Sequence, residues 1–367
     1  MNTQKTKKTL TLLVHQRMAY EWCKPILSEF SQRAPRSGFS LHVVHTLQDI
    51  PSPNSPVVLL GVDQSWLYDC LQKLDAAGRK TILMSGFAEK KSSHVSRIIV
   101  DHDDLIKKSI AHLKACGCSS IAFFGVQKDD TADKQKAQSF LSFVPKEHVF
   151  EIRDTLDECF QRLNKSLPSY DGIICSNDIV AVYLLARCKE LGISVPEKLR
   201  IIGNGNLWIS AHTAPKLTTV SEDVGKAVAI TLRMCRDFYS FDDIASFDIY
   251  MKASLQCRAS TGYEEKKAAI LSAAKVFRFF TDEDDTDPDL MAIKRIERTL
   301  CVLSLEQQQI LDRYLRGEAY ADISEKLHVS EDTLRYHIKK IYKSLHVHSK
   351  KECVCLLKKY LGGMIKR

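Results

Sequence analysis

The feature that most constrains this chain is the alternation of strand-like and helix-like segments between Lys8 and Thr261. Helical periodicity appears at Gln64–Ala77, Asp103–Cys116 and Ile179–Leu191. Apolar runs of strand length predict strands at Thr9–His15, Ser40–Thr46, Val57–Gly61, Thr81–Met84, Arg97–Val100, Ser120–Gly125, Gly172–Ser176 and Arg200–Gly203. Such an order is typical of parallel sheets covered on both faces by crossover helices, and the length of this stretch fits two α/β lobes.

The sequence changes character after Thr261. Glu264–Phe280 is predicted to be one amphipathic helix, and Leu290–Leu300 a second. Between them, Thr281–Asp289 holds six acidic residues and no basic one, which predicts a solvated linker or a helix break. From Ser304 onward every segment has helical periodicity. The predicted organisation is a polar lead at 1–7, an α/β region at 8–262, a helical and acidic linker at 263–302, and an all-α domain at 303–367.

Charge and cysteine content narrow the class of protein. The net charge of +8 fits a polyanionic partner, but a charge of this size equally serves solubility. No apolar run approaches the ~20 residues of a membrane span, so we expect a soluble, cytoplasmic protein. Most of the twelve cysteines lie in apolar-periodic segments, which predicts reduced, buried thiols. The closely spaced pairs Cys116/Cys118 and Cys353/Cys355 lack further ligands at finger spacing, so neither a metal nor a cofactor is predicted.

The region after Ser304 carries the boundary signals of four short helices. Ser304 can cap the first helix, Gln307 completes a capping box, and Gly317 can end the helix. Caps and periodicity predict the other three helices at Ala319–Leu327, from Ser330 to Leu345, and from Ser349 onward. Only His328 and Val329 separate the second helix from the third, and a turn this tight does not allow the pair to be antiparallel.

The third of these helices has two faces of different chemistry. Its apolar residues, at helical spacing, are predicted to be buried: Leu334, Ile338, Ile341 and Leu345. On another face Arg335, Lys339 and Lys343 recur every four residues, with Tyr336 and Lys340 beside them. This stripe extends about 12 Å at 1.5 Å per residue and fits a DNA major groove. A solvated basic face on an ordinary helical bundle is the alternative, and the stripe alone does not decide between the two.

The wider pattern closely resembles the LuxR-type helix-turn-helix. The resemblance covers about Leu303 to Gly362 and rests on four blocks: Leu303–Glu306, Ala321–Leu327, Val329–Ile338 and Ile341–Leu345. It implies that the third helix enters the major groove and that the last helix pairs two copies, here through Val354 and Leu357. Stripe and resemblance together predict a DNA-binding surface of Arg335, Tyr336, Lys339, Lys340, Lys343, Thr333 and Ser330. Smaller residues are common in the family where this chain has Tyr336, so no base preference follows.

The α/β region resembles the ligand-binding domain of LacI-type repressors over about Lys8 to Thr261. The blocks that carry the resemblance are Val100-Asp101, His112–Cys118, Ile121–Gly125, Asp171–Ala181, Leu191–Glu197, Ile201–Gly203 and Pro215–Val220. It implies a two-lobed fold of the periplasmic-binding-protein type that closes on a small ligand, often a sugar or a purine. The family's own N-terminal helix-turn-helix has no counterpart here, where the chain has only a short polar lead.

Several positions depart from the LacI-type pattern. Gly205 stands where that family has an acidic residue that grips ligand hydroxyls, and Lys134 aligns with its cleft arginine. Asp101, Asn177 and Asn206 complete the predicted ligand-binding residues. For each of these the alternative is turn capping or a hinge hydrogen bond, and Asn177 in particular sits where a helix N-cap belongs.

The sequence therefore predicts a DNA-binding transcription regulator, a homodimer on double-stranded DNA, that responds to a sugar-like or nucleoside-like effector between its lobes. The alternative is a degenerate sensor that serves for dimerisation or binds a protein partner. A phosphorylation-driven response regulator is not favoured, because the acidic pair it needs after the first strand is replaced by His15-Gln16-Arg17. An enzyme is not predicted either, since no phosphate loop, nucleophile elbow or metal-ligand cluster appears.

Overall fold

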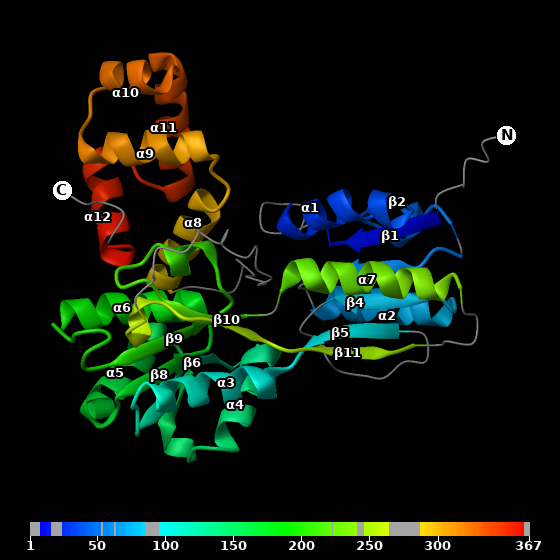
Figure 1. The fold of residues 1–367 in the computed structure, drawn as a ribbon, viewed down its shortest axis with the longest axis horizontal. Coiled ribbons are helices and arrows are strands. Elements are labelled where there is room, and N and C mark those ends of the chain that lie inside the picture. The colour runs from blue at the N-terminus through cyan, green and yellow to red at the C-terminus, as the bar shows by residue number, and fades with distance from the viewer. Residues whose placement is uncertain are drawn as a thin grey trace. The chain divides into compact units, whose positions relative to one another are not determined.

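The computed structural model describes residues 8–15, 24–52, 54–61, 64–84, 95–128, 130–221, 223–240, 246–263 and 287–362. The predicted polar lead and the predicted helix Glu264–Phe280 lie outside the described residues. Contacts divide the chain into two units, with boundaries after Leu105, Ser221 and Ser254 (Figure 1).

The first unit contains a six-stranded sheet with the order β11-β5-β4-β3-β1-β2, in which all neighbouring strands are parallel. Its strands are β1 (Lys8–Val14), β2 (Phe39–Val44), β3 (Val57–Leu60), β4 (Thr81–Met84), β5 (Val95–Val100) and β11 (Asp248–Met251). Its helices are α1 (Lys24–Arg33), α2 (Gln64–Ala76) and α7 (Val224–Phe238). Such an arrangement is the doubly wound α/β architecture.

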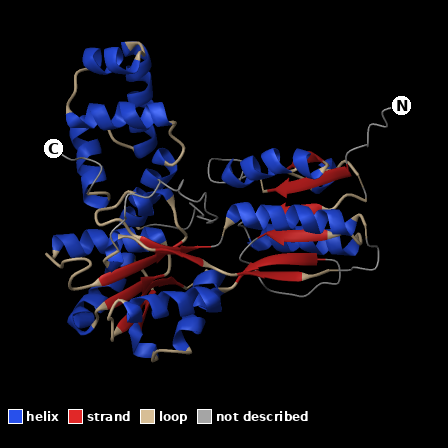
Figure 2. Ribbon diagram, in the orientation of Figure 1, coloured by secondary structure: helices blue, strands red, loops and turns tan. Residues whose placement is uncertain are grey.

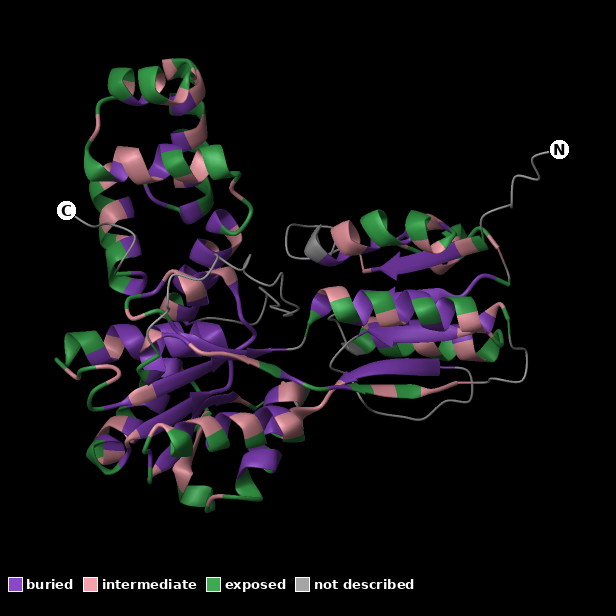
Figure 3. Ribbon diagram, viewed as in Figure 1, coloured by how far each residue is buried: buried purple, intermediate pink, exposed green. Residues whose placement is uncertain are grey.

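Alternating side chains of the central strands build two separate cores in this unit. On one face Leu12 of β1 and Val58 of β3 pack with α1 and α7. On the other face Leu13 and Leu59, one residue further along the same strands, pack with α2. Because successive strand residues point to opposite faces, continuous apolar runs can be buried only where helices cover both faces. Figure 3 shows these central strands as buried.

The C-terminal lobe is the α/β part of the second unit. Its sheet has the order β12-β10-β9-β8-β6-β7, with parallel pairing from β7 through β10. The strands are β6 (Ile121–Gln127), β7 (Val149–Ile152), β8 (Gly172–Cys175), β9 (Arg200–Asn204), β10 (Thr218–Ser221) and β12 (Ser254–Gln256). The accompanying helices are α3 (His102–Ala115), α4 (Thr131–Leu141), α5 (Leu156–Ser166) and α6 (Asp178–Glu190), as Figure 2 shows.

The part of the second unit described from residue 287 to residue 362 is helical. It consists of α8 (Pro288–Leu300), α9 (Leu305–Arg316), α10 (Tyr320–Leu327), α11 (Glu331–Leu345) and α12 (Lys350–Tyr360). The capping box of Ser304 and Gln307 is formed, and Gly317 ends α9 with φ of 95°. Ser330 and Ser349 accept the hydrogen bonds expected of N-caps. Helices α9 to α12, residues 305–361, make up the terminal helical domain.

All eight predicted strands and three predicted α/β helices are confirmed. The elements that the sequence did not predict are α1, α4, α5, α7, β7, β10, β11 and β12. Several of these are short or strongly polar; α4, for example, has charged or amide side chains at four of its first six positions. The eleven cysteines in the described part of the chain are free thiols, and seven of them are buried.

Candidate DNA-binding surface and polar interior of the C-terminal lobe

Helix α11 follows α10 through a turn of three residues. His328 ends α10 in the left-handed conformation with φ of 54°, and Ser330 caps α11. The hydroxyl of Ser324 donates to the Val329 carbonyl oxygen at 2.6 Å, which ties the turn back to α10. These local bonds hold the two helices at the sharp angle that is typical of a helix-turn-helix.

The two faces of α11 separate as predicted. Leu334, Ile338, Ile341 and Leu345 are buried. Arg335, Tyr336, Lys339, Lys340 and Lys343 are exposed. Tyr336 keeps 63% of its surface in contact with solvent, although it is a large aromatic residue. An exposed aromatic ring among four cations is a better match to a nucleic-acid surface than to an ordinary solvated face.

Arg335 makes two contacts within the terminal helical domain. Its guanidinium carbon lies 4.7 Å from the ring centroid of Tyr320. It also donates to the Glu331 carboxylate, one helical turn earlier, at 3.2 Å. Both ionic groups are largely exposed, so this ion pair contributes little stability, and its main effect is on the direction of the arginine side chain.

Ser330 and Thr333, the two hydroxyl residues of the predicted DNA-binding surface, lie at the N-terminus of α11. Ser330 is exposed and accepts from the Thr333 N–H at 3.2 Å. The hydroxyls of Ser330 and Thr333 are 2.8 Å apart. A helix N-terminus with hydroxyl groups suits an anion, and the role of these two residues in DNA binding stays a prediction.

Helix α12 holds the two residues predicted to pair copies of the chain. Val354 is half-buried, whereas Leu357 has no exposed surface. The interior of this chain therefore already covers Leu357, and pairing through it stays a prediction.

The four predicted ligand-binding residues lie in different places. Asp101 belongs to the first unit, where its carboxylate accepts from the Asp104 N–H and so caps α3. Lys134 is exposed on α4. Asn177 is the N-cap of α6, the alternative that the sequence left open. Asn206 is buried with φ of 48°, and its side-chain oxygen accepts from Arg258 at 2.7 Å.

Lys136, two residues beyond Lys134, is buried and was not among the predicted site residues. Its ammonium group donates to Asp133 and to the Ser176 carbonyl oxygen, each at 2.5 Å. Ser176 directly follows β8, and the carboxylate of Asp133 accepts from the N–H of Gln127 at the end of β6. This ion pair thus sits at the carboxyl ends of two adjacent parallel strands, where ligands bind in open α/β sheets. Asp133 and Lys136 are three residues apart, a spacing at which opposite charges pair on a helix, and this signal in the sequence could have identified Lys136.

The segment after β9 is held by buried charged side chains. Asp178 accepts from the Leu207 N–H at 2.7 Å and from the Thr219 hydroxyl at 2.6 Å. Arg258 donates to Asn206, to the Ser210 hydroxyl and to the Leu217 carbonyl oxygen. Gly203 must be glycine here, because a Cβ atom would lie 2.2 Å from the Asp178 carboxylate.

A second carboxylate, that of Glu297, reaches the same segment from α8. Glu297 accepts from the N–H groups of Trp208 and Ile209, at 3.0 and 2.7 Å, at the start of the short 3₁₀ helix η6 (Trp208–Ala211). Burial raises the pKa of Glu297 to about 7; these two hydrogen bonds oppose the shift and the nearby Asp178 adds to it. The His212 ring stacks on Trp208 with 3.7 Å between centroids, and burial lowers its pKa.

The described residues include no candidate for a membrane-spanning helix or for a metal site. No helix in the described ranges has the length and apolar character needed to span a membrane. Within the same ranges, no group of three or more histidine, cysteine, aspartate or glutamate side chains is arranged to hold a metal ion.

Comparison with known proteins identifies two domains. Residues 110–261 match the family of periplasmic binding protein-like domains. Residues 301–357 match the luxR family of bacterial regulatory proteins, and this range contains α9, α10 and α11. Both matches agree with the resemblances seen in the sequence.

Individual known proteins are similar to part of the chain. The uncharacterized HTH-type transcriptional regulator YvdE of Bacillus subtilis is 24% identical over 157 residues, which are 41% of this chain and 50% of that protein. The chain spans about half the length of the curated relatives it matches. A transcription regulator from Lactobacillus plantarum has a similar fold, with a TM-score of 0.56, 18% identity, and coverage of 68% of this chain and 98% of that one.

A second similar structure contains a ligand. The LacI family transcriptional regulator from Enterococcus faecium with bound ribose has a TM-score of 0.52 and 17% identity over 69% of this chain and 98% of that one. At such identities the likeness establishes the fold alone. The chain joins a periplasmic binding protein-like domain to a domain of the luxR family of bacterial regulatory proteins.

Proposed function

We propose that this protein is a transcription regulator that binds specific double-stranded DNA through α11. The observation that carries the proposal is the division of α11 into a buried apolar face and an exposed face with Arg335, Tyr336 and Lys339. The match of this region to the luxR family of regulatory proteins supports it. Arg335 and Lys339 would contact base edges, while Ser330 and Thr333 at the helix N-terminus would bind phosphates.

The test begins by selecting bound sequences from a random pool of duplex DNA with the full chain. The variant that combines Arg335→Ala with Lys339→Ala is expected to lose selective enrichment, since it removes the cations best placed to reach bases. For the unaltered chain, the logarithm of affinity should fall with the logarithm of salt concentration by about 0.9 per phosphate contacted.

A charge-matched control separates base reading from general attraction. Lys73→Ala combined with Lys165→Ala removes two positive charges from exposed positions on α2 and α5. This control should enrich the same sequences as the unaltered chain. Equal enrichment by the Arg335/Lys339 variant would refute the assignment of α11 as the recognition helix.

We further propose that the regulator acts as a homodimer in which α12 contributes to pairing. Half-buried Val354 is the accessible apolar position for such a contact, whereas Leu357 would first have to leave the interior. Sedimentation velocity of the full chain with and without its selected DNA tests this. Val354→Asp should weaken pairing on DNA, and unchanged stoichiometry in that variant would contradict the role of α12.

The periplasmic binding protein-like domain is proposed to bind a small polar ligand, of sugar or nucleoside type. The ion pair of Lys136 and Asp133, at the carboxyl ends of β6 and β8, supports this, because convergent charged groups at that edge suit hydroxyl-rich ligands. Lys134, two residues away and exposed, and Asp101 in the first unit remain proposed contacts.

A second candidate is a sensor that has lost its small ligand and serves for dimerisation or for a protein partner. The buried positions of Asn177 and Asn206 favour it, because both side chains are already bonded within the fold. Thermal unfolding with pentoses, hexoses, disaccharides and nucleosides separates the two candidates. A true ligand at one hundred times its Kd adds about 2.7 kcal/mol of stability, whereas a lost site shows no shift across the panel.

A further inference from the structure

Helix α8 is buried on most of its circumference. Eight of its thirteen residues are buried: Leu290, Ala292, Ile293, Lys294, Ile296, Glu297, Thr299 and Leu300. A helix that covers a single surface keeps one polar face in solvent, so burial to this extent means that α8 packs on more than one side. Its neighbours are α6 and η6 of the C-terminal lobe and α11 and α12 of the terminal helical domain.

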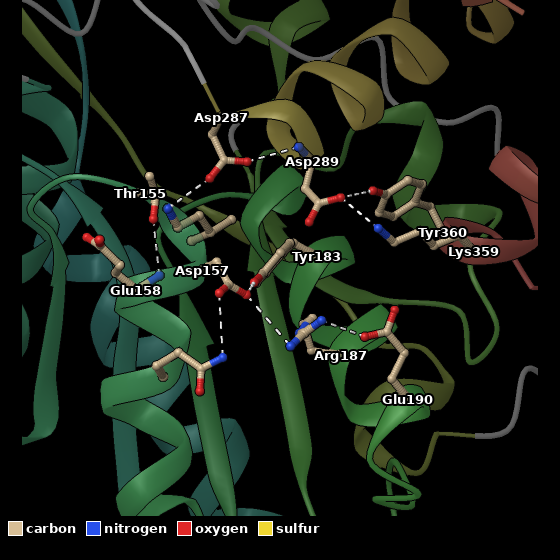
Figure 4. Close-up of polar contacts among 12 residues, drawn as sticks. Thr155, Asp157, Glu158, Tyr183, Arg187, Glu190, Asp287, Asp289, Lys359 and Tyr360 are labelled. Atoms are coloured by element: carbon tan, nitrogen blue, oxygen red, sulfur yellow. Dashed lines mark hydrogen bonds and ion pairs between the residues drawn. The ribbon is translucent and has the colours of Figure 1, made fainter.

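Toward the C-terminal lobe, α8 is held by two carboxylates that accept hydrogen bonds from main-chain N–H groups. Glu297 binds the first N–H groups of η6, at Trp208 and Ile209. Asp287, the N-cap of α8, also accepts from the Leu156 N–H at the start of α5 at 2.9 Å (Figure 4). Each carboxylate thus satisfies donors at a helix terminus that would otherwise lack partners inside the protein.

Toward the terminal helical domain, α8 makes two contacts with the C-terminal end of α11. The hydroxyls of Thr299 and Ser344 are 2.7 Å apart, and both residues lie within helices. The Arg295 guanidinium lies 3.2 Å from the Nδ1 atom of His346, the residue that ends α11. The helix that carries the proposed DNA contacts is therefore bonded to α8 at its far end.

A third contact joins α8 to the end of α12. The Asp289 carboxylate accepts from the Lys359 ammonium at 2.7 Å and from the Tyr360 hydroxyl, as Figure 4 shows. Burial acts to raise the pKa of Asp289, but these two hydrogen bonds outweigh it and keep the pKa below its usual range. Nearby, the Lys189 ammonium of α6 donates to the Lys358 carbonyl oxygen at 3.4 Å. Both α8 and α6 thus hold the end of α12.

We propose that α8 is a splint, a helix that fixes the terminal helical domain to the C-terminal lobe. The orientation of α11 then depends on the position of segment 206–211. Helix α8 covers the surface of the lobe that η6 and the start of α5 form. The acidic stretch Thr281–Asp289 predicted a solvated linker or a helix break. Its last residues begin a new helix: Asp287 caps α8 and accepts from the Leu156 N–H, and Asp289 accepts from Lys359 and Tyr360. This inference rests on the proposed function, because it concerns how that DNA-binding surface is held.

Through α8, segment 206–211 of the C-terminal lobe is connected to α11, the helix with the proposed DNA contacts. Asn206 and Leu207 lie two and three residues beyond the end of β9, and Trp208 and Ile209 donate to Glu297. A ligand or partner that moves segment 206–211 displaces the partners of Glu297, and α8 passes the displacement to Ser344 and His346. A ligand that binds both positions of this segment equally well has no effect on α11.

Hydrogen–deuterium exchange of the full chain, read by mass spectrometry, tests the splint without DNA. Glu297→Ala alters only the side of α8 that faces the lobe. The expected result is exchange at least about tenfold faster in residues 342–361, on the opposite side of α8, because removing a charged hydrogen-bond acceptor lowers the free energy of local opening. Asp289→Ala should likewise accelerate exchange in 350–361.

A control and a fold check accompany these variants. Asp312→Ala removes an acidic residue of α9 that pairs with Arg316, one helical turn later on the same helix, and it should leave 342–361 unchanged within about twofold. Slow exchange in β8 and β9 confirms that each variant is folded, and Glu297→Leu, which also lacks a hydrogen-bond acceptor but better fills the buried space, replaces any Glu297→Ala protein that is not. If folded lobe-side variants leave 342–361 unchanged, the splint is overturned.

The outcome is distinct from that of the DNA experiment. The combined Arg335→Ala and Lys339→Ala variant should keep the exchange pattern of the unaltered chain while it loses selective DNA binding. Normal DNA binding by that variant would overturn the proposed function and leave the exchange result standing. Unaltered exchange in the Glu297 variants would overturn the splint and leave the DNA assignment standing.

Discussion

The guanidinium group of Arg335 lies over the ring of Tyr320, with 4.7 Å between the guanidinium carbon and the ring centroid. Tyr320 begins α10 and Arg335 lies in the first half of α11, so the contact spans the helix-turn-helix. The ring of Tyr320 is in turn 5.5 Å from that of Tyr314 in α9. The direction of the proposed base-reading arginine is thus set by aromatic residues of the two preceding helices.

Tyr320→Leu should weaken binding to the selected DNA by about two- to fivefold, since a cation–π contact at an exposed site contributes roughly 0.5–1 kcal/mol and its loss frees the Arg335 side chain. Tyr320→Phe keeps the ring and should bind within about twofold of the unaltered chain. Fluorescence anisotropy with selected and scrambled duplexes measures both effects.

A double-mutant cycle distinguishes positioning from a direct contact. If Tyr320 acts through Arg335, Tyr320→Leu has little further effect when Arg335 is already alanine. Additive losses in the combined variant would show that Tyr320 contributes to binding by another route.

Gly203→Ala should lower the free energy of unfolding by about 3 kcal/mol, because an added Cβ meets the Asp178 carboxylate at 2.2 Å and a Leu217 methyl group at 2.8 Å. Gly192→Ala is the matched control, since it has φ of 67° and open space around the added atom, and it should cost about 1 kcal/mol. Urea unfolding measures both values. Equal destabilisation by the two substitutions would show that the side chains around Asp178 rearrange to accommodate the added methyl group.

The pKa of Glu297, about 7, makes stability depend on pH. The carboxyl group binds its proton more tightly in the folded chain than in the unfolded one, where the pKa is near 4.5. Its contribution to stability is therefore complete below about pH 4.5 and is lost as the pH rises to 7, by up to about 1.4 kcal/mol per pH unit. The free energy of unfolding of Glu297→Gln, measured relative to the unaltered chain, should rise from pH 5 to pH 7 and then stay level. A difference that does not vary with pH contradicts this account.

Thiol reactivity should follow burial. Cys301 and Cys355 are exposed, whereas Cys175 and Cys235 are fully buried and burial raises the pKa of both thiols. A maleimide at neutral pH should therefore label Cys301 and Cys355 within minutes, and the buried pair only after unfolding. Peptide mapping identifies each labelled thiol. Rapid labelling of Cys175 in the folded chain would mean that the core of the C-terminal lobe opens readily.

Local chemistry in the sequence determined a large part of this protein. The strands with continuous apolar runs were predictable because a buried parallel strand needs apolar residues on both faces. The caps at Ser304, Ser330 and Ser349, and the two faces of α11, depend on residues three or four positions apart. Helical spacing by itself therefore places Arg335, Tyr336 and Lys339 away from the buried face of α11.

Contacts between residues far apart in the chain were decided only by the tertiary structure. Lys136, rather than Lys134, is the buried cation because its helix faces the end of β8. Glu297 caps η6 across 88 residues of chain, and Asp287 caps α5 across 131. In the sequence, Asp287 and Asp289 belong to an acidic stretch that favours solvent. A carboxylate is stable inside a protein only where main-chain or side-chain donors converge on it, and packing α8 between two domains brings those donors together.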